Sequence, residues 1–356
     1  MTVSGDRRFA FYAKRYSRKK ASIRLRVLEP MAALREAGVD VRRYPKLTGP
    51  AGCDAVVISK AFGRGAVKAT QAAQQAGCGL IFDICDNRFA NNRVKASARH
   101  GERTISLLSQ ADLVTVPTQT MGELLTAATP EIEGRIRVVP DMLEDMSSLS
   151  AQRPSLIERF RLARLRRFLA GHPDALHVVW FGNNMAGISG VGEMEEAVAH
   201  LRVFAKNHPV TLTIITNKPA AYRKASANWG IPSVYMPWSL ASFPGALGLH
   251  RVAIIPVARN AYTAGKSINR PATAIMAGLG VIADSIESYE ELRPFIVLDD
   301  WQDGLSRYAY GWDAEQERLA QARAHLDAHY GRRRVAERWV EIFEELARQK
   351  AAAAVI

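Results

Sequence analysis

The chain has 356 residues, of which 48% are hydrophobic and 23% charged, and its formal net charge is +13. This composition excludes a disordered, collagen-like or coiled-coil protein, and the length predicts two domains. The cysteines Cys53, Cys78 and Cys85 lack the spacing of a zinc site or a disulfide framework, and the apolar runs are too short to predict a signal peptide or a membrane-spanning helix. We therefore expect a protein of a reducing compartment.

The positive charge is distributed unevenly along the chain. Residues 1–170 contain 29 basic and 16 acidic side chains, whereas residues 171–356 contain 19 of each. Such asymmetry indicates an anionic partner of the first half, which could be nucleic acid, an acidic membrane surface or a phosphorylated substrate. A solvated basic face that only serves solubility explains the same charge.

Short apolar runs alternate with segments of helical period in the first half, which is typical of βαβ units on a parallel sheet. The expected strands are residues 9–13, 55–58, 80–84, 113–116 and 136–139, and the expected helices are residues 24–37, 65–76, 94–109 and 122–126.

A further helix, residues 155–169, is expected to link the two halves. It carries five arginines together with Leu156, Phe160, Leu165 and Phe168. The pattern fits a helix that lies on a membrane surface, and it fits equally an interdomain helix with a charged exterior.

The second half repeats the plan. Its expected strands are residues 177–181, 211–216, 234–236, 252–256, 280–283 and 295–298, and its expected helices are residues 193–207, 220–228, 269–277, 287–292, 313–329 and 332–349. We therefore predict an α/β protein with two Rossmann-like, doubly wound domains, residues 1–170 and 171–330, followed by a C-terminal helical segment, residues 331–356.

Ligands of open parallel sheets bind outside the carboxyl ends of the strands, so residues after each strand are the first candidates for a site. Asp86, Asn87 and Arg88 follow the strand at residues 80–84, and Asp86 is our candidate general base, with Asp83 turned into the structure. The alternative is that Asp86 and Asn87 only cap the next turn.

A second candidate site follows the strand at residues 252–256. Lys266, Ser267, Asn269 and Arg270 stand where a polar loop enters a helix, and a helix N-terminus with such side chains favours an anion such as phosphate. The P-loop pattern is incomplete because its first glycine is missing. Ser267 or Asn269 as a simple helix cap is the alternative.

Two more segments are candidates for ligand contacts. Gly182, Asn183 and Asn184 open a glycine-rich loop after the strand at residues 177–181, without the dinucleotide-binding spacing. Arg24 and Arg26 belong to a basic segment after the first strand and are predicted to contact an anion, although a solvated basic turn explains them too. Patterns of serine hydrolases, metal sites and nucleic-acid stacking platforms are absent, so we expect no metal and no nucleic acid.

Residues 21–41, 111–125, 135–145 and 266–284, together with the paired α/β halves, resemble the nucleotide-sugar-dependent glycosyltransferases of the GT-B fold. The resemblance implies two domains that face each other across a cleft, with an acceptor bound by the first and a nucleotide-sugar donor by the second. It also implies a last helix that crosses back onto the first domain. Sugar transfer to a glycan, lipid-linked or protein acceptor is then expected, in cell-surface polysaccharide or glycoconjugate synthesis, with no cofactor.

The resemblance has one departure. Many retaining members carry two glutamates before the strand that here is residues 280–283, and the alignment puts Gly265 and Thr273 in their places. The sequence therefore leaves inversion and retention both open. A catalytically degenerate GT-B-like protein that binds an anionic polymer or partner is the alternative function, and a sugar epimerase of similar fold is another. The basic first half favours a cytoplasmic protein at the inner face of the membrane.

Overall fold

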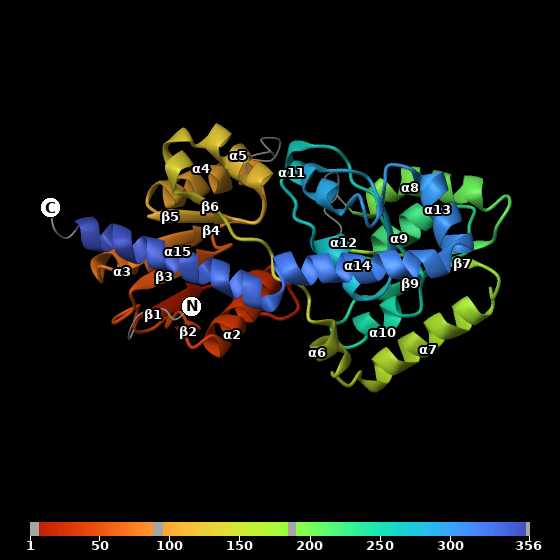
Figure 1. Cartoon of the computed structure of the whole chain (residues 1–356), viewed down its shortest axis with the longest axis horizontal. Coiled ribbons are helices and arrows are strands. Elements are labelled where there is room, and N and C mark those ends of the chain that lie inside the picture. Colours follow the sequence, from red (N-terminus) through yellow and green to blue (C-terminus); the bar gives the residue numbers. More distant parts are fainter. Residues whose placement is uncertain (1–6, 88–94, 184–189, 354–356) are drawn as a thin grey trace. The chain divides into compact units, whose positions relative to one another are not determined.

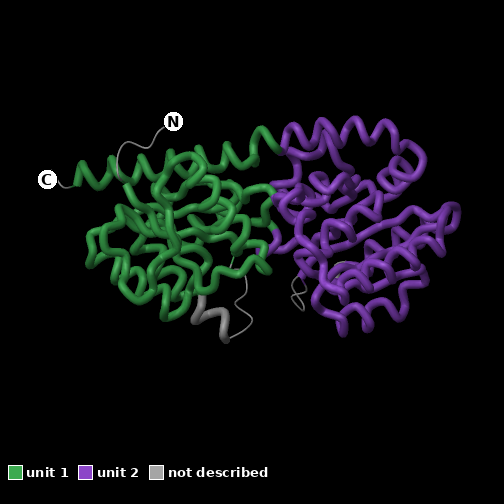
Figure 2. The backbone as a smooth tube through the Cα atoms, turned by 90° about the horizontal axis from the view of Figure 1, so that it is seen from below, with its two compact units in different colours: residues 1–143, 264–267, 327–356 green, residues 144–263, 268–326 purple. Residues whose placement is uncertain are grey.

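The computed structural model describes residues 7–87, 95–183 and 190–353, apart from the side chains of residues 95–100 and Glu193 (Figure 1). The chain forms two compact units (Figure 2). The first unit contains residues 1–143, 264–267 and 327–356, and the second contains residues 144–263 and 268–326. Two segments late in the sequence thus belong to the unit that begins the chain.

The first unit is built on a six-stranded sheet in which all pairs are parallel. Its strands are β1 (Arg8–Tyr12), β2 (Asp40–Arg43), β3 (Ala55–Ser59), β4 (Gly79–Asp83), β5 (Leu113–Val116) and β6 (Ile136–Val138). The order β2-β1-β3-β4-β5-β6 reverses between β1 and β3. The sequence analysis missed β2, because this edge strand is mostly polar and only Val41 is buried.

Helices cover both faces of the first sheet, because successive residues of a strand point to opposite sides. Phe9 and Phe11 point to one face, where α1 (Ala21–Ile23), the π-helical turn η1 (Arg24–Leu28), α2 (Glu29–Glu36) and α15 (Arg332–Ala353) supply the packing. Ala10 and Tyr12 point to the other, which packs against α3 (Arg64–Gln75), α4 (Lys95–Ser109) and α5 (Gln119–Ala128). The short helix η2 (Pro130–Arg135) precedes β6.

The C-terminal helix α15 completes the core of the first unit. The ring of Phe343 stacks on Phe9 with centroids 3.9 Å apart, and Trp339 meets Phe11 edge-on at 5.3 Å. A Cβ on Gly79 would lie 2.7 Å from the side chain of Leu346, so any larger residue there would require this leucine to shift. The core of this unit is therefore assembled from both ends of the sequence.

The second unit also has a six-stranded parallel sheet. Its strands are β7 (Leu176–Phe181), β8 (Val210–Thr216), β9 (Ser233–Pro237), β10 (Val252–Ile255), β11 (Gly280–Ala283) and β12 (Val297–Leu298), in the order β12-β11-β10-β7-β8-β9. This is the strand order of a dinucleotide-binding Rossmann sheet, which reverses between its first and fourth strands, here β7 and β10. The predicted fold class, two Rossmann-like α/β domains, is confirmed.

The helices around the second sheet include several short ones. They are α6 (Met146–Ser150), α7 (Leu156–Ala170), η3 (Val191–Glu193), α8 (Met194–Phe204), α9 (Pro219–Ser226), α10 (Phe243–Leu247), α11 (Ala261–Ala264), α12 (Asn269–Met276), η4 (Glu287–Leu292), α13 (Trp301–Tyr310) and α14 (Trp312–Tyr330). Among the described residues, no helix has both the length and the apolar character that crossing a bilayer requires.

Helix α7 lies in the second unit, whereas the sequence analysis placed it in the first domain as a linker helix. The physical reason is a stripe of leucines. Leu162, Leu165 and Leu169 are buried, and the helix packs against β9 and α10. The boundary between the units therefore falls at Leu143 and not near residue 170.

Candidate functional site

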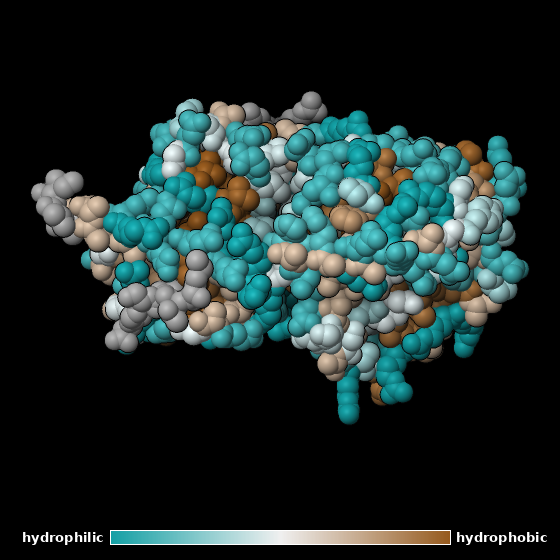
Figure 3. All heavy atoms as spheres, viewed as in Figure 1, coloured by the Kyte–Doolittle hydropathy of each residue, from teal (hydrophilic) through white to brown (hydrophobic). Residues whose placement is uncertain are grey.

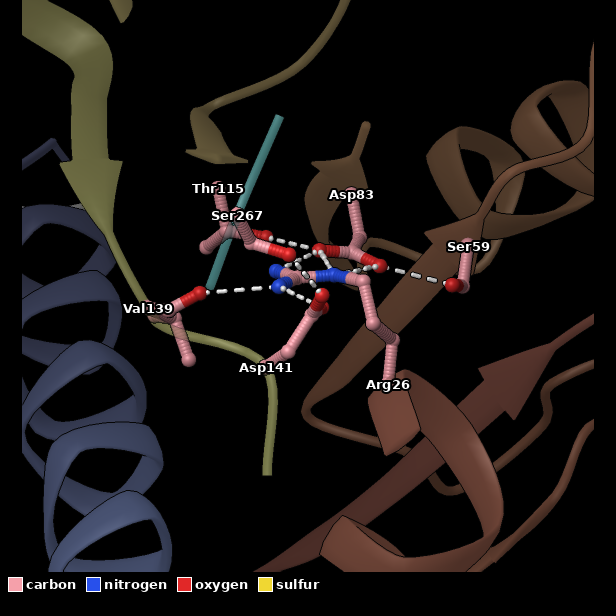
Figure 4. A network of polar contacts seen from close by, with 7 residues as sticks. All are labelled: Arg26, Ser59, Asp83, Thr115, Val139, Asp141 and Ser267. Atoms are coloured by element: carbon pink, nitrogen blue, oxygen red, sulfur yellow. Dashed lines mark hydrogen bonds and ion pairs between the residues drawn. The ribbon is translucent and has the colours of Figure 1, made fainter. Parts of the chain in front are cut away.

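A buried ionic network lies at the carboxyl edge of the first sheet (Figure 4). The Arg26 guanidinium donates to Asp83 from Nε at 2.9 Å and from Nη2 at 2.5 Å, and from Nη1 to Asp141 at 3.0 Å. Nη1 also donates to the carbonyl oxygen of Val139 at 2.9 Å. Arg26 and Asp83 are both almost fully buried, so this guanidinium is bound by groups of the protein itself.

Two hydroxyls complete the environment of the Asp83 carboxylate. Ser59 donates at 2.7 Å and Thr115 at 2.9 Å, and both side chains are buried on β3 and β5, the two strands that flank β4. Burial by itself would lower the pKa of Arg26, but the carboxylates of Asp83 and Asp141 outweigh it and raise the pKa. A buried charge is tolerated only where it is paired and hydrogen-bonded in this way.

The arginine reaches this network from a π-helical turn. Pro30 has no N–H to donate to the carbonyl of Arg26, four residues earlier, and in an ordinary α-helix its ring would clash with that carbonyl. The helix therefore widens to a π-helical turn over residues 24–28. Single π-turns of this kind often occur at functional sites.

Asp86 lies between two ammonium groups. Its carboxylate is 2.5 Å from the Nζ of Lys60 and 2.6 Å from the Nζ of Lys266. Burial would raise the pKa of Asp86, but the charges and hydrogen bonds of both lysines outweigh burial and hold this pKa well below its usual range. Lys60 itself has a φ of 47°, a left-handed conformation that costs energy for a residue other than glycine.

The other contacts predicted within residues 1–170 that the structure describes are buried. Arg24 is buried and donates from Nη1 to the carbonyl of Arg18 at 2.5 Å. Asn87 is also buried, and Arg88 lies outside the described residues. The two arginines expected to contact an anion are thus both buried: Arg24 donates to a carbonyl of the turn before α1, and Arg26 donates to groups at the carboxyl edge of the first sheet.

The second unit presents a different arrangement where its strand order reverses. Gly182 directly follows β7, and Arg270 lies in the first turn of α12. The Arg270 guanidinium lies over the Trp180 ring at 5.8 Å from its centroid. A Cβ on Gly182 would come within 3.1 Å of Trp180 and 3.3 Å of an Arg270 nitrogen, so the glycine gives the guanidinium its room.

Arg270 is half-buried, and within the described part of the chain it forms no ion pair. Cation–π contact with a tryptophan orients a guanidinium without neutralising it. Crevices at such a switch point are where Rossmann sheets bind ligands. The geometry therefore leaves a positive charge at the expected ligand-binding edge of the second sheet.

The remaining predicted donor contacts are only partly brought together. Lys266 and Ser267 belong to the first unit, where Ser267 donates to Asp141 at 2.5 Å. Asn269 begins α12 beside Arg270, Asn183 is exposed after Gly182, and Asn184 lies outside the described residues. The structure thus places Gly182, Trp180 and Arg270 in one cluster and Lys266 with Asp86 in another.

Sequence reasoning missed three charged residues of these edges. Lys60 follows β3, Asp141 is the third residue after β6, and Asp284 directly follows β11. Asp284 accepts the backbone N–H of Val257 at 2.8 Å and the Trp301 indole N–H at 3.0 Å, and burial raises its pKa. Asp86 was selected because ligands bind beyond the carboxyl ends of parallel strands. The same criterion would have selected these three residues, since each follows a strand closely.

Comparison with known proteins gives structural neighbours only. No protein-family model matches the chain, and no curated protein sequence does. Among solved structures, it is similar to an E. coli trehalose-6-phosphate protein bound with UDP-2-fluoro glucose, with a TM-score of 0.62 and 10% identity over 94% of this chain and 98% of that one.

Two further neighbours are glycosyltransferases by description. One is from Rickettsia africae, with a TM-score of 0.62 and 11% identity over 96% of this chain and 99% of that one. The other is WaaG, a glycosyltransferase involved in lipopolysaccharide biosynthesis, with a TM-score of 0.61 and 12% identity over 94% and 99%. Each of these matches covers at least 94% of this chain, and therefore both of its units. The chain thus has the GT-B fold.

Proposed function

We propose that this protein is a glycosyltransferase that moves a sugar from a nucleotide-sugar donor to an acceptor hydroxyl. The observation that carries the proposal is the cluster of Gly182, Trp180 and Arg270, in which a cation without an ion-pair partner among the described residues lies at the switch point of a Rossmann sheet. A neighbour of the same fold is described with UDP-2-fluoro glucose bound. The diphosphate of such a donor is the kind of anion that this guanidinium would bind.

On this proposal the second unit binds the donor. Arg270 contacts the diphosphate, and Gly182 allows its close approach, with Asn183, Asn184 and Asn269 as further contacts. Lys266 and Ser267 are proposed phosphate ligands as well. Because both now bind carboxylates of the first unit, this role requires them to exchange Asp86 and Asp141 for phosphate oxygens.

In the proposed reaction an acceptor oxygen forms a bond to the anomeric carbon while the bond from that carbon to the phosphate oxygen breaks. The acceptor hydroxyl loses its proton to a base, and the nucleoside diphosphate leaves with the negative charge. Arg270 stabilises that developing charge, as a fixed cation does in a site preorganised for the transition state. The reaction as proposed uses no metal or other cofactor.

Asp86 is the proposed base, and the ion pairs define how it would act. A base works best when its pKa is near the working pH, and Lys60 and Lys266 hold the pKa of Asp86 far below that. Asp86 therefore accepts a proton only after one lysine has moved away. Asp86→Asn should reduce kcat by about 10²–10⁴-fold, and full turnover by a normally folded variant would remove Asp86 from the mechanism.

The proposed acceptor is a glycan, lipid-linked or protein hydroxyl bound by the first unit, with Asn87, Arg88, Arg24 and Arg26 near it. The basic composition of residues 1–170 supports an anionic acceptor, such as a phosphorylated or lipid-linked glycan. A cytoplasmic protein working at the inner face of the membrane, in polysaccharide or glycoconjugate synthesis, fits this acceptor.

One observation favours a second candidate, a GT-B-like protein that binds an anionic polymer or partner without catalysis. A Cβ on Gly265 would lie 2.9 Å from the sulfur of Met121, and Thr273 is buried. These positions stand where many retaining relatives carry glutamates, and neither has room for a longer acidic side chain without displacement of its neighbours.

A thermal-shift screen separates the two candidates. UDP, GDP, CMP and dTDP, alone and as their common sugars, are added to the purified protein at physiological salt. A donor site predicts stabilisation by one nucleotide class, of about 3 kcal/mol at a concentration one hundred times its Kd, followed by detection of a glycosylated product. Absence of any shift, with steeply salt-dependent binding of an acidic glycan, would support the binding protein instead.

A further inference from the structure

Helix α7 exposes large apolar side chains to solvent. The exposed fractions are 79% for Leu156, 64% for Ile157 and 71% for Phe160, all within the first five residues of the helix. The other large apolar side chains exposed in the described residues, Leu47, Val203 and Tyr310, belong to three different elements. Single exposed hydrophobics are ordinary, whereas a contiguous group marks a surface that contacts something apolar.

These side chains lie on the face of α7 that points away from its own unit. Leu162, Leu165 and Leu169 recur every three or four residues and are buried. Leu156, Phe160, Ala163 and Arg167 recur in the same way and are exposed, so they form the opposite face. The helix therefore has two apolar regions, of which only the inner one is covered by the second unit.

The start of α7 is fixed, so the exposed group is held in a helix. Ser155 and Glu158 form a capping box, in which the Ser155 backbone N–H donates to Glu158 at 2.8 Å and the Glu158 N–H donates to the Ser155 hydroxyl at 3.3 Å. Reciprocal caps of this kind satisfy two backbone donors that the first turn leaves open.

Arginines surround the outer apolar group. Those of α7 are all exposed, and they are Arg159, Arg161, Arg164, Arg166 and Arg167. Glu158 is the one acidic residue of the helix, and the cap uses its carboxylate. Figure 3 shows hydrophilic and hydrophobic side chains together along the edge of the molecule where Figure 1 places α6 and α7.

We propose that α7 docks the protein on an anionic lipid bilayer, with Leu156, Ile157 and Phe160 entering the headgroup boundary and the arginines contacting lipid phosphates. Apolar residues bordered by cations on one helix face are what interfacial helices use, and each cation near an anionic surface adds to the affinity. The proposed function includes work at the inner face of the membrane, and this inference adds the surface that docks there. It does not depend on which sugar is transferred or on whether transfer occurs.

Charge argues against a second copy of the chain as the occupant. A two-fold symmetric contact would bring α7 against its own image. Five arginines would then meet five arginines, with no free carboxylate on either helix to offset them. An anionic bilayer satisfies the apolar and the charged parts of the surface together.

The test is co-sedimentation of the full-length protein with vesicles of phosphatidylcholine, with and without 30% phosphatidylglycerol, at low and at physiological salt. We expect binding to the anionic vesicles, weaker binding as salt rises, and little binding to phosphatidylcholine alone.

Paired variants then assign the binding to α7. Leu156→Ser with Phe160→Ser should weaken vesicle binding by roughly tenfold for each side chain. The matched control is Leu47→Ser, which removes a fully exposed leucine from the other unit and should leave binding unchanged. All three positions are exposed, so these variants should keep the thermal stability of the parent.

Arginine variants test the electrostatic part. Arg164→Gln with Arg167→Gln should weaken binding to anionic vesicles by about fivefold per charge. Arg333→Gln with Arg334→Gln removes two exposed arginines of α15 and serves as the control. Equal binding to neutral and anionic vesicles, or equal losses in the α7 and control variants, would overturn the proposal. So would absence of vesicle binding, or a dimer that the Leu156 and Phe160 substitutions dissociate.

Discussion

The two units place an arginine at the carboxyl edge of a parallel sheet and give it opposite surroundings. In the first unit Arg26 is enclosed by Asp83, Asp141 and a carbonyl oxygen. In the second unit Arg270 lies on the face of Trp180 without an ion-pair partner among the described residues. The comparison teaches that an arginine near a strand end is available to a ligand only where the fold supplies no carboxylate for it.

The same contrast holds for the buried titratable groups. The first unit buries ionised carboxylates beside cations, as in the Asp86 cluster. The second unit buries the imidazole of His250 between the carbonyl of Ala246 at 2.8 Å and the hydroxyl of Thr213 at 2.7 Å, and no ion pair to it occurs among the residues that the structure describes. Burial lowers the pKa of His250 to about 4, so this side chain is neutral when folded.

Removal of the Arg26 charge should have the largest effect, and it tests the structural role that the first unit gives this residue. Arg26→Met leaves Asp83 buried without its cation, which should cost about 3–5 kcal/mol of stability. Urea unfolding measures this cost, and hydrogen exchange shows whether β4 loses protection before β8 does. The control is Arg8→Met, which breaks an exposed pair with Asp40 and should cost less than about 1 kcal/mol. Similar costs for both variants would mean that the buried network contributes little.

The pH dependence of the second unit should be the next largest effect. An unfolded His250 binds a proton near pH 6.5, whereas the folded one does so only near pH 4, so stability falls as the pH decreases between these values. The loss should reach about 3 kcal/mol at the acid end of that window. A series of unfolding midpoints from pH 7 to pH 4 measures it.

His250→Gln is the matched variant for this series. The glutamine retains hydrogen-bonding capacity but does not titrate, so its stability should change much less between pH 6.5 and pH 4. A variant that kept the full slope would show that other groups cause it.

Arg270→Ala should affect binding more than stability. Loss of one charge-assisted contact should weaken nucleotide affinity by about 10- to 100-fold, which corresponds to roughly 1.5–3 kcal/mol. Arg251→Ala is the matched control, because Arg251 lies over Trp312 at 5.2 Å just before β10, at the other end of the same sheet. Calorimetric titration measures the affinity of both variants for the nucleotide found in the thermal-shift screen. Equal affinity of the Arg270 variant and the parent would refute the donor site.

The smallest effect on stability should come from the Asp86 cluster. The folded pKa of Asp86 is depressed, so its contribution to stability is present above the unfolded pKa, near pH 4, and is lost as the pH falls further. Because the lysines remain partly exposed, Asp86→Asn should cost only about 1–2 kcal/mol at pH 7. Unfolding midpoints below pH 4 should converge for variant and parent, and a constant difference there would contradict the ion-pair account.

The α/β class and nearly every strand could be predicted from the sequence, because the buried strands of a parallel sheet are short continuous apolar runs separated by segments of helical period. The strands at residues 55–58 and 113–116, for example, could be predicted from their apolar runs without knowledge of the tertiary structure. The edge strand β2 was missed because three of its four residues are not buried, which removes that signal.

Only the tertiary structure decided which charged residues can meet a ligand. Arg26 and Arg270 look alike in sequence, and the carboxylates that separate them come from Asp83 and Asp141, which are 57 and 115 residues from Arg26 along the chain. The pairing of Lys266 with Asp86 spans 180 residues. Local patterns report helix and strand periodicity, whereas the partner of a charge depends on which strand ends the fold brings together.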